Sequence, residues 1–286
     1  MLIEAKNVSH VYMPGTAFQV DALKDVTLGI KRGEFIGVIG ETGSGKSTLV
    51  QHFNGLLKPT SGQIRVEGSN IWSGKTNLRQ LRSRIAMLFQ FPEHQLFEET
   101  VFKDVAFGPR NLGMEGRELE ERVRYGLNMM ELDYVAFIER SPFSLSGGEK
   151  RRVAMAGILA MYPEVIILDE PTAGMDPVGR RHFLQQIQRL HREQDVTIIF
   201  VTHNMEDISM LAERLFVFSQ GGLVLQGKPA EVFQSRKILT KIGLDIPVIT
   251  DLLQKIRLAG REVRTDIFTV EEACREIIRA YKEGVG

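Results

Sequence analysis

A glycine-rich loop between an apolar segment and a helical segment constrains this chain more than any other feature. Residues 40–47 read Gly-Glu-Thr-Gly-Ser-Gly-Lys-Ser and match the pattern G-x-x-x-x-G-K-[ST] at every fixed position. Residues 35–39 form a short apolar run typical of a buried strand, and residues 46–57 have helical character. Such a strand–loop–helix unit wraps a polyphosphate with backbone N–H groups, because glycines permit close approach and the helix N-terminus attracts anions.

The loop pattern also predicts individual roles. Lys46 is expected to neutralise the outer phosphates, and the Ser47 hydroxyl is expected to reach Mg²⁺. A plain glycine turn is the alternative interpretation, and the flanking strand and helix argue against it. The predicted phosphate-binding residues are Gly40, Glu41, Thr42, Gly43, Ser44, Gly45, Lys46, Ser47 and Thr48.

Two acids follow a second apolar run, at residues 165–168. A carboxylate just past the carboxyl end of a buried parallel strand faces the crevice where ligands bind, so Asp169 is expected to bind Mg²⁺. Successive side chains of an extended segment point to opposite sides, so Glu170 is free to face the attacking water as general base or water-orienting group. A solvated acidic pair is the alternative, and the phosphate loop upstream disfavours it.

The order of the predicted elements indicates an α/β fold. The apolar runs at 165–168 and 197–201 flank a predicted helix at 178–193, which implies a parallel sheet covered by helices on both faces. Further strands are expected at 2–11, 22–30 and 63–66, a mostly helical stretch at 93–162, and short helices at 229–241, 248–258 and 270–282. Gly260 is a candidate helix-ending glycine, and Thr269 with Glu272 fits a capping box.

Composition narrows the class of protein. The chain has 286 residues, which at ~150 residues per domain allows two domains, or one large domain with an appendage. Lys+Arg and Asp+Glu both number 36, and this balance argues against nucleic acid as a partner. The single cysteine, Cys274, excludes an internal disulfide framework and favours a reducing compartment. The apolar runs are far shorter than the ~18 residues of a spanning helix, so any membrane association requires a partner.

The segment Leu-Ser-Gly-Gly-Glu at residues 145–149 resembles the signature motif of the ATP-binding-cassette (ABC) ATPases. It is a second Ser/Gly nest that opens a helix, hence a second anion site. In this family the signature of one subunit closes over the ATP bound to its partner, so the resemblance implies a head-to-tail ATPase dimer. The residues expected to act on the partner's ATP are Ser146, Gly147, Gly148 and Glu149.

Other family positions also match. By resemblance, Gln90 reaches Mg²⁺ and the attacking water and couples the site to a transport partner. Asp176 lies in the loop that crosses to the partner subunit, His203 contacts the terminal phosphate, and Tyr12 stacks on adenine. The resemblance covers residues 2–227. It implies a P-loop NTPase (RecA-like) core, an N-terminal antiparallel β subdomain and a helical subdomain at about 91–163, all within an ABC ATPase domain at 1–227. A C-terminal helical extension at 228–286 follows.

The segment after Gln90 resembles the ATPases of energy-coupling-factor (ECF) importers of vitamins and metal ions. Its Pro-Glu-His-Gln-Leu-Phe sequence at 92–97 is most similar to the second of their two ATPase subunits. The resemblance implies three partners at the cytoplasmic face of the cell membrane: a second homologous ATPase, in a heterodimer or a homodimer, a membrane scaffold subunit, and a separate substrate-binding membrane subunit. Gln95, Leu96 and Phe97 are expected to contact the scaffold, although core packing could also absorb these apolar residues.

The expected activity is transport-coupled ATP hydrolysis with ATP and Mg²⁺ as cofactors. The ATPase of a conventional ABC importer is the main alternative, because only the segment after Gln90 and the C-terminal extension argue against it. A soluble ABC ATPase acting on DNA or ribosomes is disfavoured. The chain has one cassette and no heptad-rich segment between Lys46 and Ser146.

Overall fold

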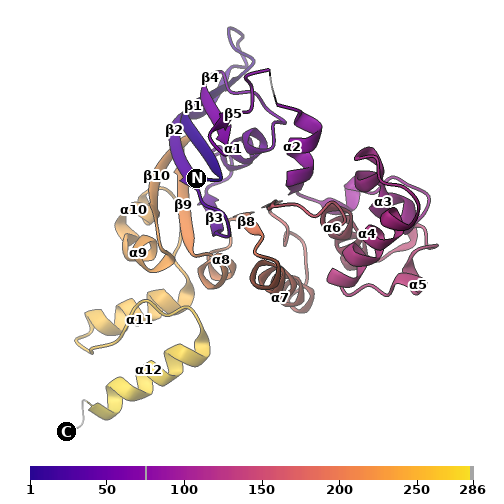
Figure 1. The fold of residues 1–286 in the computed structure, drawn as a ribbon. Coiled ribbons are helices and arrows are strands. Elements are labelled where there is room, and N and C mark those ends of the chain that lie inside the picture. Colours follow the sequence, from indigo (N-terminus) through magenta and orange to yellow (C-terminus); the bar gives the residue numbers. More distant parts are fainter. Residues whose placement is uncertain (75, 284–286) are drawn as a thin grey trace.

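The computed structural model describes residues 1–74 and 76–283, and the strands within them form two sheets (Figure 1). The larger sheet has six strands in the order β10-β9-β3-β8-β7-β6. Its strands are β3 (Phe35–Gly40), β6 (Ile85–Leu88), β7 (Val165–Asp169), β8 (Thr197–Val201), β9 (Arg214–Ser219) and β10 (Gly222–Gly227). All neighbours pair in parallel except β10, which is antiparallel to β9. The carboxyl ends of the parallel strands therefore meet at one edge.

Helices cover both faces of this sheet, as the apolar strands predict. Every residue of β3, β7 and β8 is buried. Side chains of α1 (Lys46–Phe53) share a buried cluster with one face of the sheet, and those of α7 (Pro177–Gln194) and α8 (Met205–Leu211) share a cluster with the other face. The expected α/β class is thus confirmed.

The smaller sheet is antiparallel and has the strand order β2-β1-β4-β5. Its strands are β1 (Ile3–Tyr12), β2 (Val20–Ile30), β4 (Ser61–Val66) and β5 (Ser69–Asn70). Their inward side chains pack in the same buried cluster as α1 and one face of the larger sheet. The antiparallel sheet and the parallel core therefore share one hydrophobic interior.

The stretch between β6 and β7 is helical, as expected, and its helices lie together at one side of the molecule (Figure 1). They are η1 (Pro92–Gln95), α3 (Val101–Asn111), α4 (Gly116–Met129), α5 (Tyr134–Phe137), η2 (Pro142–Ser144) and α6 (Gly147–Leu159). Thr100, Asp133 and Ser146 each accept a backbone N–H with their side chains and begin α3, α5 and α6. The short helix α2 (Leu78–Arg84) precedes β6.

The C-terminal segment contains α9 (Pro229–Gln234), α10 (Arg236–Lys241), α11 (Val248–Leu258) and α12 (Val270–Glu283). One helix was expected at 229–241, but Ser235 leaves the helical conformation (ψ 39°) and divides it in two. Phe233 and Leu239 pack in the interior of the cassette, whereas Leu253 belongs to a separate small cluster with side chains from the last part of the chain. The end of the expected extension, residues 284–286, lies outside the described residues.

Other details of the sequence-based expectations were wrong or incomplete. The sequence does not predict strands β5, β6, β9 and β10. Helix α1 ends at Phe53 rather than at residue 57, because Gly55 follows with φ 69°. Gly260 has φ 90°, as expected of a helix-ending glycine, and the Glu272 N–H donates to Thr269 Oγ1 at 3.3 Å. No helix in residues 1–74 and 76–283 combines the length and apolar character needed to cross a membrane.

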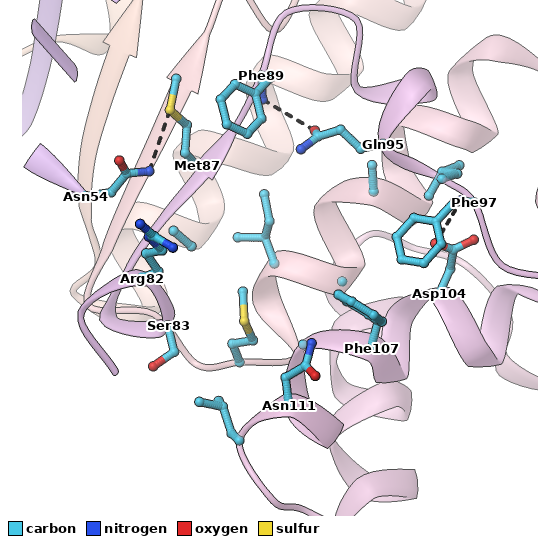
Figure 2. A pocket seen from close by; sticks show the side chains of 18 of the residues that line it. Asn54, Arg82, Ser83, Met87, Phe89, Gln95, Phe97, Asp104, Phe107 and Asn111 are labelled. Carbon is cyan, nitrogen blue, oxygen red and sulfur yellow. Dashed lines mark hydrogen bonds between the residues drawn. The ribbon is translucent and has the colours of Figure 1, made fainter. Parts of the chain in front are cut away.

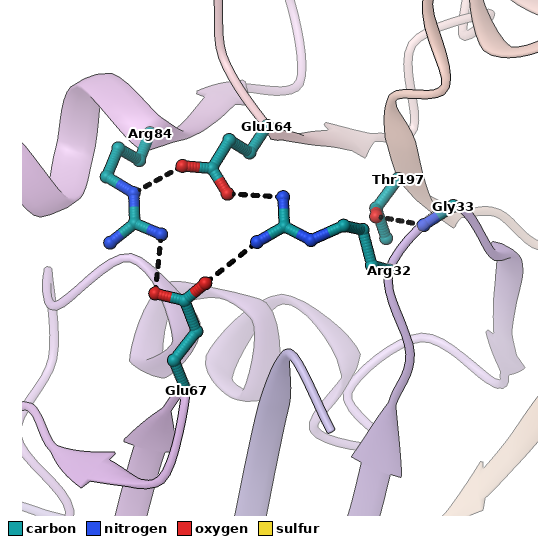
Figure 3. Close-up of polar contacts among 6 residues, drawn as sticks. All are labelled: Arg32, Gly33, Glu67, Arg84, Glu164 and Thr197. Atoms are coloured by element: carbon teal, nitrogen blue, oxygen red, sulfur yellow. Dashed lines mark hydrogen bonds and ion pairs between the residues drawn. The ribbon is translucent and has the colours of Figure 1, made fainter.

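A closed ring of four ion-paired side chains lies at the amino-terminal edge of the parallel strands (Figure 3). Arg32 pairs with Glu67 at 2.7 Å and with Glu164 at 2.6 Å. Arg84 pairs with the same two carboxylates, at 2.8 and 2.5 Å. The two arginines hold the pKa of Glu164 below its usual range. Glu67 follows β4 of the smaller sheet, and the other three residues precede strands of the larger sheet. The ring therefore fastens the two sheets to each other.

Candidate functional site

The glycine-rich loop connects β3 to α1 at the carboxyl edge of the parallel sheet, where sequence reasoning placed it. Gly45 has φ 101°, and a methyl group there would overlap the Ala22 carbonyl oxygen. Lys46 is buried, and its Nζ donates to the carbonyl oxygens of Gly40 at 2.7 Å and Glu41 at 2.8 Å. Burial lowers the pKa of Lys46. The buried hydroxyl of Ser44 has no hydrogen-bond partner among the described residues. The loop thus holds the Lys46 ammonium group and the Ser44 hydroxyl in positions where both can bind an anion.

Asp169 lies at the end of β7, beside the start of α1. The Ser47 hydroxyl donates to Asp169 Oδ1 at 3.2 Å. Burial raises the pKa of Asp169, and the hydrogen bond from Ser47 opposes this shift. Gln90 is exposed and follows β6, the strand that pairs with β7. Hydroxyl, carboxylate and amide oxygens are the donors that Mg²⁺ prefers, so these residues fit such an ion.

Glu170 and His203 are brought together by the pairing of β7 with β8. His203 Nδ1 lies 2.9 Å from Glu170 Oε1. Glu170 adopts φ 49°, so the extended conformation ends at Asp169 and does not include Glu170, contrary to the expectation from the sequence; the Glu170 N–H donates to the Val201 carbonyl at 3.0 Å. The side chain of Glu170 is 14% exposed and that of His203 is 69% exposed. The pair therefore joins a sheltered carboxylate to an accessible imidazole.

Tyr12 lies at the end of β1, against the start of α1. Its hydroxyl is 3.3 Å from Thr48 Oγ1, and its ring meets the edge of His10 with centroids 4.5 Å apart. His52 Nδ1 donates to the Thr48 carbonyl at 2.6 Å, and its Nε2 lies 3.2 Å from His10 Nδ1. Burial lowers the pKa of His52 to about 4, so its ring is neutral near pH 7. His10 Nδ1 also lies 3.2 Å from the Lys58 carbonyl oxygen, which can only accept, so the His10 N–H is shared between that oxygen and His52 Nε2. Sequence reasoning missed both histidines, because their spacing matches no metal or catalytic pattern.

The signature residues begin α6 with a reciprocal capping box. The Glu149 N–H donates to Ser146 Oγ at 3.3 Å, and the Ser146 N–H donates to Glu149 Oε2 at 2.8 Å. These hydrogen bonds hold the pKa of Glu149 below its usual range. Ser146, Gly147 and Gly148 are exposed. The first residues of α6 therefore present backbone N–H groups to the outside of the molecule.

Asp176 caps α7. Its Oδ1 accepts from the N–H groups of Val178 and Gly179, both at 3.0 Å. These backbone donors lower the pKa of Asp176. The acid thus has a structural role in its own chain in addition to the role that the resemblance implies.

An apolar groove of about 560 Å³ lies between the α2–β6 segment and helices α3 and α6 (Figure 2). Gln95 lines it, and the Gln95 side-chain oxygen accepts from the Phe89 N–H at 3.4 Å. Leu96 is only 8% exposed and packs in the hydrophobic core, whereas Phe97 is 57% exposed. The rings of Phe97 and Phe107 meet edge to face, with centroids 4.9 Å apart. The three residues expected at a scaffold contact therefore differ. Gln95 and the exposed Phe97 are accessible to a partner at the groove, whereas Leu96 is buried and packs in the core.

The C-terminal segment touches the phosphate loop, which sequence reasoning did not anticipate. Gly243 follows α10 with φ 70°, and a methyl group there would overlap the Glu41 side chain. The Val248 N–H also lies 3.4 Å from Oε1 of Glu206, which is near His203 in the chain. The segment therefore contacts both the phosphate loop and the helix that follows the histidine.

Comparisons with known proteins agree with this geometry. Residues 23–173 match the family model described as "ABC transporter". The chain is 50% identical to the energy-coupling factor transporter ATP-binding protein EcfA2 of Clostridium perfringens, over 98% of this chain and 99% of that protein. It is also 50% identical to the EcfA2 protein of Clostridioides difficile, over 99% of this chain and 98% of that protein.

Two solved structures are similar as well. One is cbiO1 of Clostridium perfringens, described as part of the ABC transporter complex cbiONQ, with TM-score 0.74 and 37% identity over 88% of this chain and 98% of that chain. The other is a dimeric ATP-binding cassette in a post-hydrolysis state with ADP and Pi, with TM-score 0.68 and 31% identity over 79% of this chain and 98% of that chain. The family match and the nearly full-length relatives show that this chain belongs to the ABC transporter family and, within it, to the ATP-binding proteins of energy-coupling factor transporters.

Proposed function

We propose that this chain is the ATP-hydrolysing subunit of an ECF importer and drives uptake of a vitamin or a metal ion. The observation that carries the proposal is the meeting of two pairs at one sheet edge. Ser47 with Asp169 forms an oxygen-donor pair, and Glu170 with His203 forms a carboxylate–imidazole pair. The two pairs lie beside the phosphate-binding loop and its buried Lys46. This arrangement suits the transfer of a phosphoryl group to water.

Each site residue then has a role. Lys46 and the loop N–H groups bind the phosphates, and Tyr12 stacks on adenine. Ser47, Asp169 and Gln90 would hold Mg²⁺, which when bound neutralises charge on the phosphates. Glu170 orients and deprotonates the attacking water, and His203 contacts the terminal phosphate while holding Glu170 in position.

The signature residues act on a second nucleotide. We propose that Ser146, Gly147, Gly148 and Glu149 close over ATP bound to a second, homologous ATPase subunit, with Asp176 in the loop that crosses to it. The exposed capping box at the start of α6 supports this arrangement, because its N–H groups point away from the chain's own core. The C-terminal segment 228–286 is proposed as an extension of the ATPase domain at 1–227 that helps to hold the two ATPases together.

The apolar groove between the α2–β6 segment and helices α3 and α6 is the proposed contact with the membrane subunits. We propose that a membrane scaffold subunit inserts a helix there, at the cytoplasmic face, and that a separate membrane subunit binds the transported substrate. An apolar groove rimmed by polar residues is the usual receptor for an amphipathic helix. Phe97 and Gln95 would contact the inserted helix directly.

The direct test is Glu170→Gln in the assembled complex. ATP binding should persist, and phosphate release should fall by ~10²- to 10⁴-fold, because the amide cannot take a proton from water. Unchanged turnover would remove Glu170 from this role. Purification of the complex then tests the partners, since a small membrane scaffold and a substrate-binding membrane subunit should accompany the chain. If neither does, a conventional ABC importer becomes the better assignment.

A further inference from the structure

Arg151 is a buried arginine that none of the roles above uses. It lies in the first turns of α6, and its side chain is only 6% exposed. Its Nη2 atom lies 3.4 Å from Glu93 Oε2 and donates to the Ala173 carbonyl oxygen at 3.0 Å. Its Nε and Nη1 atoms are buried without a hydrogen-bond partner among the described residues.

The contacts of Arg151 join three segments that are distant in the sequence. Glu93 is in η1, which begins two residues after Gln90. The other end of η1 is also tied down, because Gln95 accepts from the Phe89 N–H. Ala173 lies between Glu170 and Asp176, and its own N–H donates to the Glu170 carbonyl at 3.1 Å. Two hydrogen bonds in series, through Ala173, therefore connect Arg151 to the backbone of Glu170, and one ion pair connects it to η1, which borders the groove.

Stability does not explain an arginine at this position. A buried guanidinium loses several kcal/mol of hydration, and one carboxylate at 3.4 Å with one carbonyl offsets only part of that loss. Its remaining donors gain nothing in return. An apolar side chain of similar length would fill the same space without this cost. What the arginine adds is a fixed geometry between two loops.

We propose that Arg151 is a positioning residue that couples the groove to the hydrolytic centre. When a partner in the groove displaces η1, Glu93 shifts, and Arg151 carries that shift to Ala173 and so to the setting of Glu170. The inference rests on the proposed function, since it needs both a partner in the groove and hydrolysis at Glu170.

The test compares ATP turnover in two preparations: the ATPase pair alone, and the same pair assembled with the membrane scaffold. The readout is the ratio of the two kcat values, together with KM for ATP. We expect Arg151→Met to lower this ratio about tenfold and to leave KM unchanged. Arg151→Lys should recover part of the ratio, because it keeps the charge but cannot span both partners as a planar fork. A merely structural role would change turnover equally in both preparations.

Glu93→Gln provides an independent variant in case Arg151→Met does not fold. It should reproduce the loss of the ratio, and the double variant should be no worse than either single one, because the two residues act through one contact. The control is Arg117→Met, which removes an arginine whose side chain is 92% exposed on α4. It should leave the ratio unchanged.

A ratio that stays at the native value in folded Arg151→Met, Arg151→Lys or Glu93→Gln would overturn the inference. Additive losses in the double variant would do the same. These results differ from a failure of the proposed function. In that case Glu170→Gln would retain native turnover, or the native pair would show no response to the scaffold at all.

Discussion

His203 Nδ1 lies 2.9 Å from Glu170 Oε1, across the ends of two adjacent parallel strands. The strand register sets this distance, since Asp169 at the end of β7 pairs with Val201 at the end of β8. A carboxylate oxygen accepts hydrogen bonds, so His203 Nδ1 is the donor in this contact, and Nε2 takes no part in it. The relationship therefore orients both side chains at once.

Replacing His203 by Ala should slow ATP turnover by ~10²-fold or more, because Glu170 loses the group that orients it. ATP binding should fall far less than turnover, since His203 contacts only the terminal phosphate and Lys46 and the loop are untouched. Phosphate release and binding of a fluorescent ATP analogue measure the two effects. His182→Ala, at an exposed histidine on α7, is the control for loss of an imidazole. Native turnover in the His203 variant would contradict the assignment.

The groove predicts opposite outcomes for two adjacent residues. Leu96→Ala should destabilise the protein by ~2–4 kcal/mol, because Leu96 is buried in the core. Phe97→Ala should cost at most ~1 kcal/mol of stability, because the ring loses its edge-to-face contact with Phe107, and should weaken association with the scaffold by ~1–2 kcal/mol. Denaturant unfolding and scaffold pull-down at graded concentrations distinguish the two. Val135→Ala on α5, an exposed apolar residue outside the groove, is the control. Native association of Phe97→Ala would argue against the groove as the contact.

Much of this site could be predicted from the sequence, because local patterns carry it. The loop at 40–47 and the acids after 165–168 are short motifs whose spacing reports their chemistry. The difference between Leu96 and Phe97 could not be predicted, because both are large apolar residues and only the packing of η1 against α6 decides which is covered. The contact of Gly243 with Glu41 was also inaccessible, since the two residues are distant in the sequence and no local pattern links them.

The same reason explains the missed strands. Residues 85–88 are a short apolar run inside a charged stretch, and β6 forms there because β7 offers a parallel neighbour. Likewise β10 alternates weakly and is held by its antiparallel pairing with β9. Tertiary pairing rather than local propensity sets these elements.

The buried histidine pair predicts a stability loss in mild acid. The folded protein holds the pKa of His52 at about 4, below its ordinary value of 6.5. The unfolded chain therefore binds the proton more tightly, and stability should decline as pH falls from ~6.5 to ~4, by at most ~3 kcal/mol from this group. His52→Gln, which cannot take up that proton, should show a smaller decline. Denaturant titrations at several pH values test this, and an equal decline in both proteins would contradict it.

The contact between the C-terminal segment and the phosphate loop can be tested with two glycines. Gly243→Ala should strain the backbone and push against Glu41, raising KM for ATP by ~3- to 10-fold. Gly260→Ala is the matched control, because Gly260 also has positive φ but faces open space. Both variants should lose ~1–2 kcal/mol of stability, and only the first should alter KM.

Adding Glu41→Gly to Gly243→Ala should restore part of the lost affinity, because it removes the overlapping side chain. If Gly243→Ala and Gly260→Ala have the same KM as the native protein, the contact has no influence on nucleotide binding.

The ion-pair ring of Arg32, Glu67, Arg84 and Glu164 lies where the chain enters β6, before the helical region, and where it enters β7, after that region. Arg84 immediately precedes β6, and Glu164 immediately precedes β7. The ring therefore holds the amino-terminal ends of the two strands that flank the helical region in the sequence. A strand that is held at its amino-terminal end can move most at its carboxyl end. We therefore expect a displacement that starts at the groove to be larger at the carboxyl edge, where Gln90 and Glu170 lie, than at the joint between the two sheets.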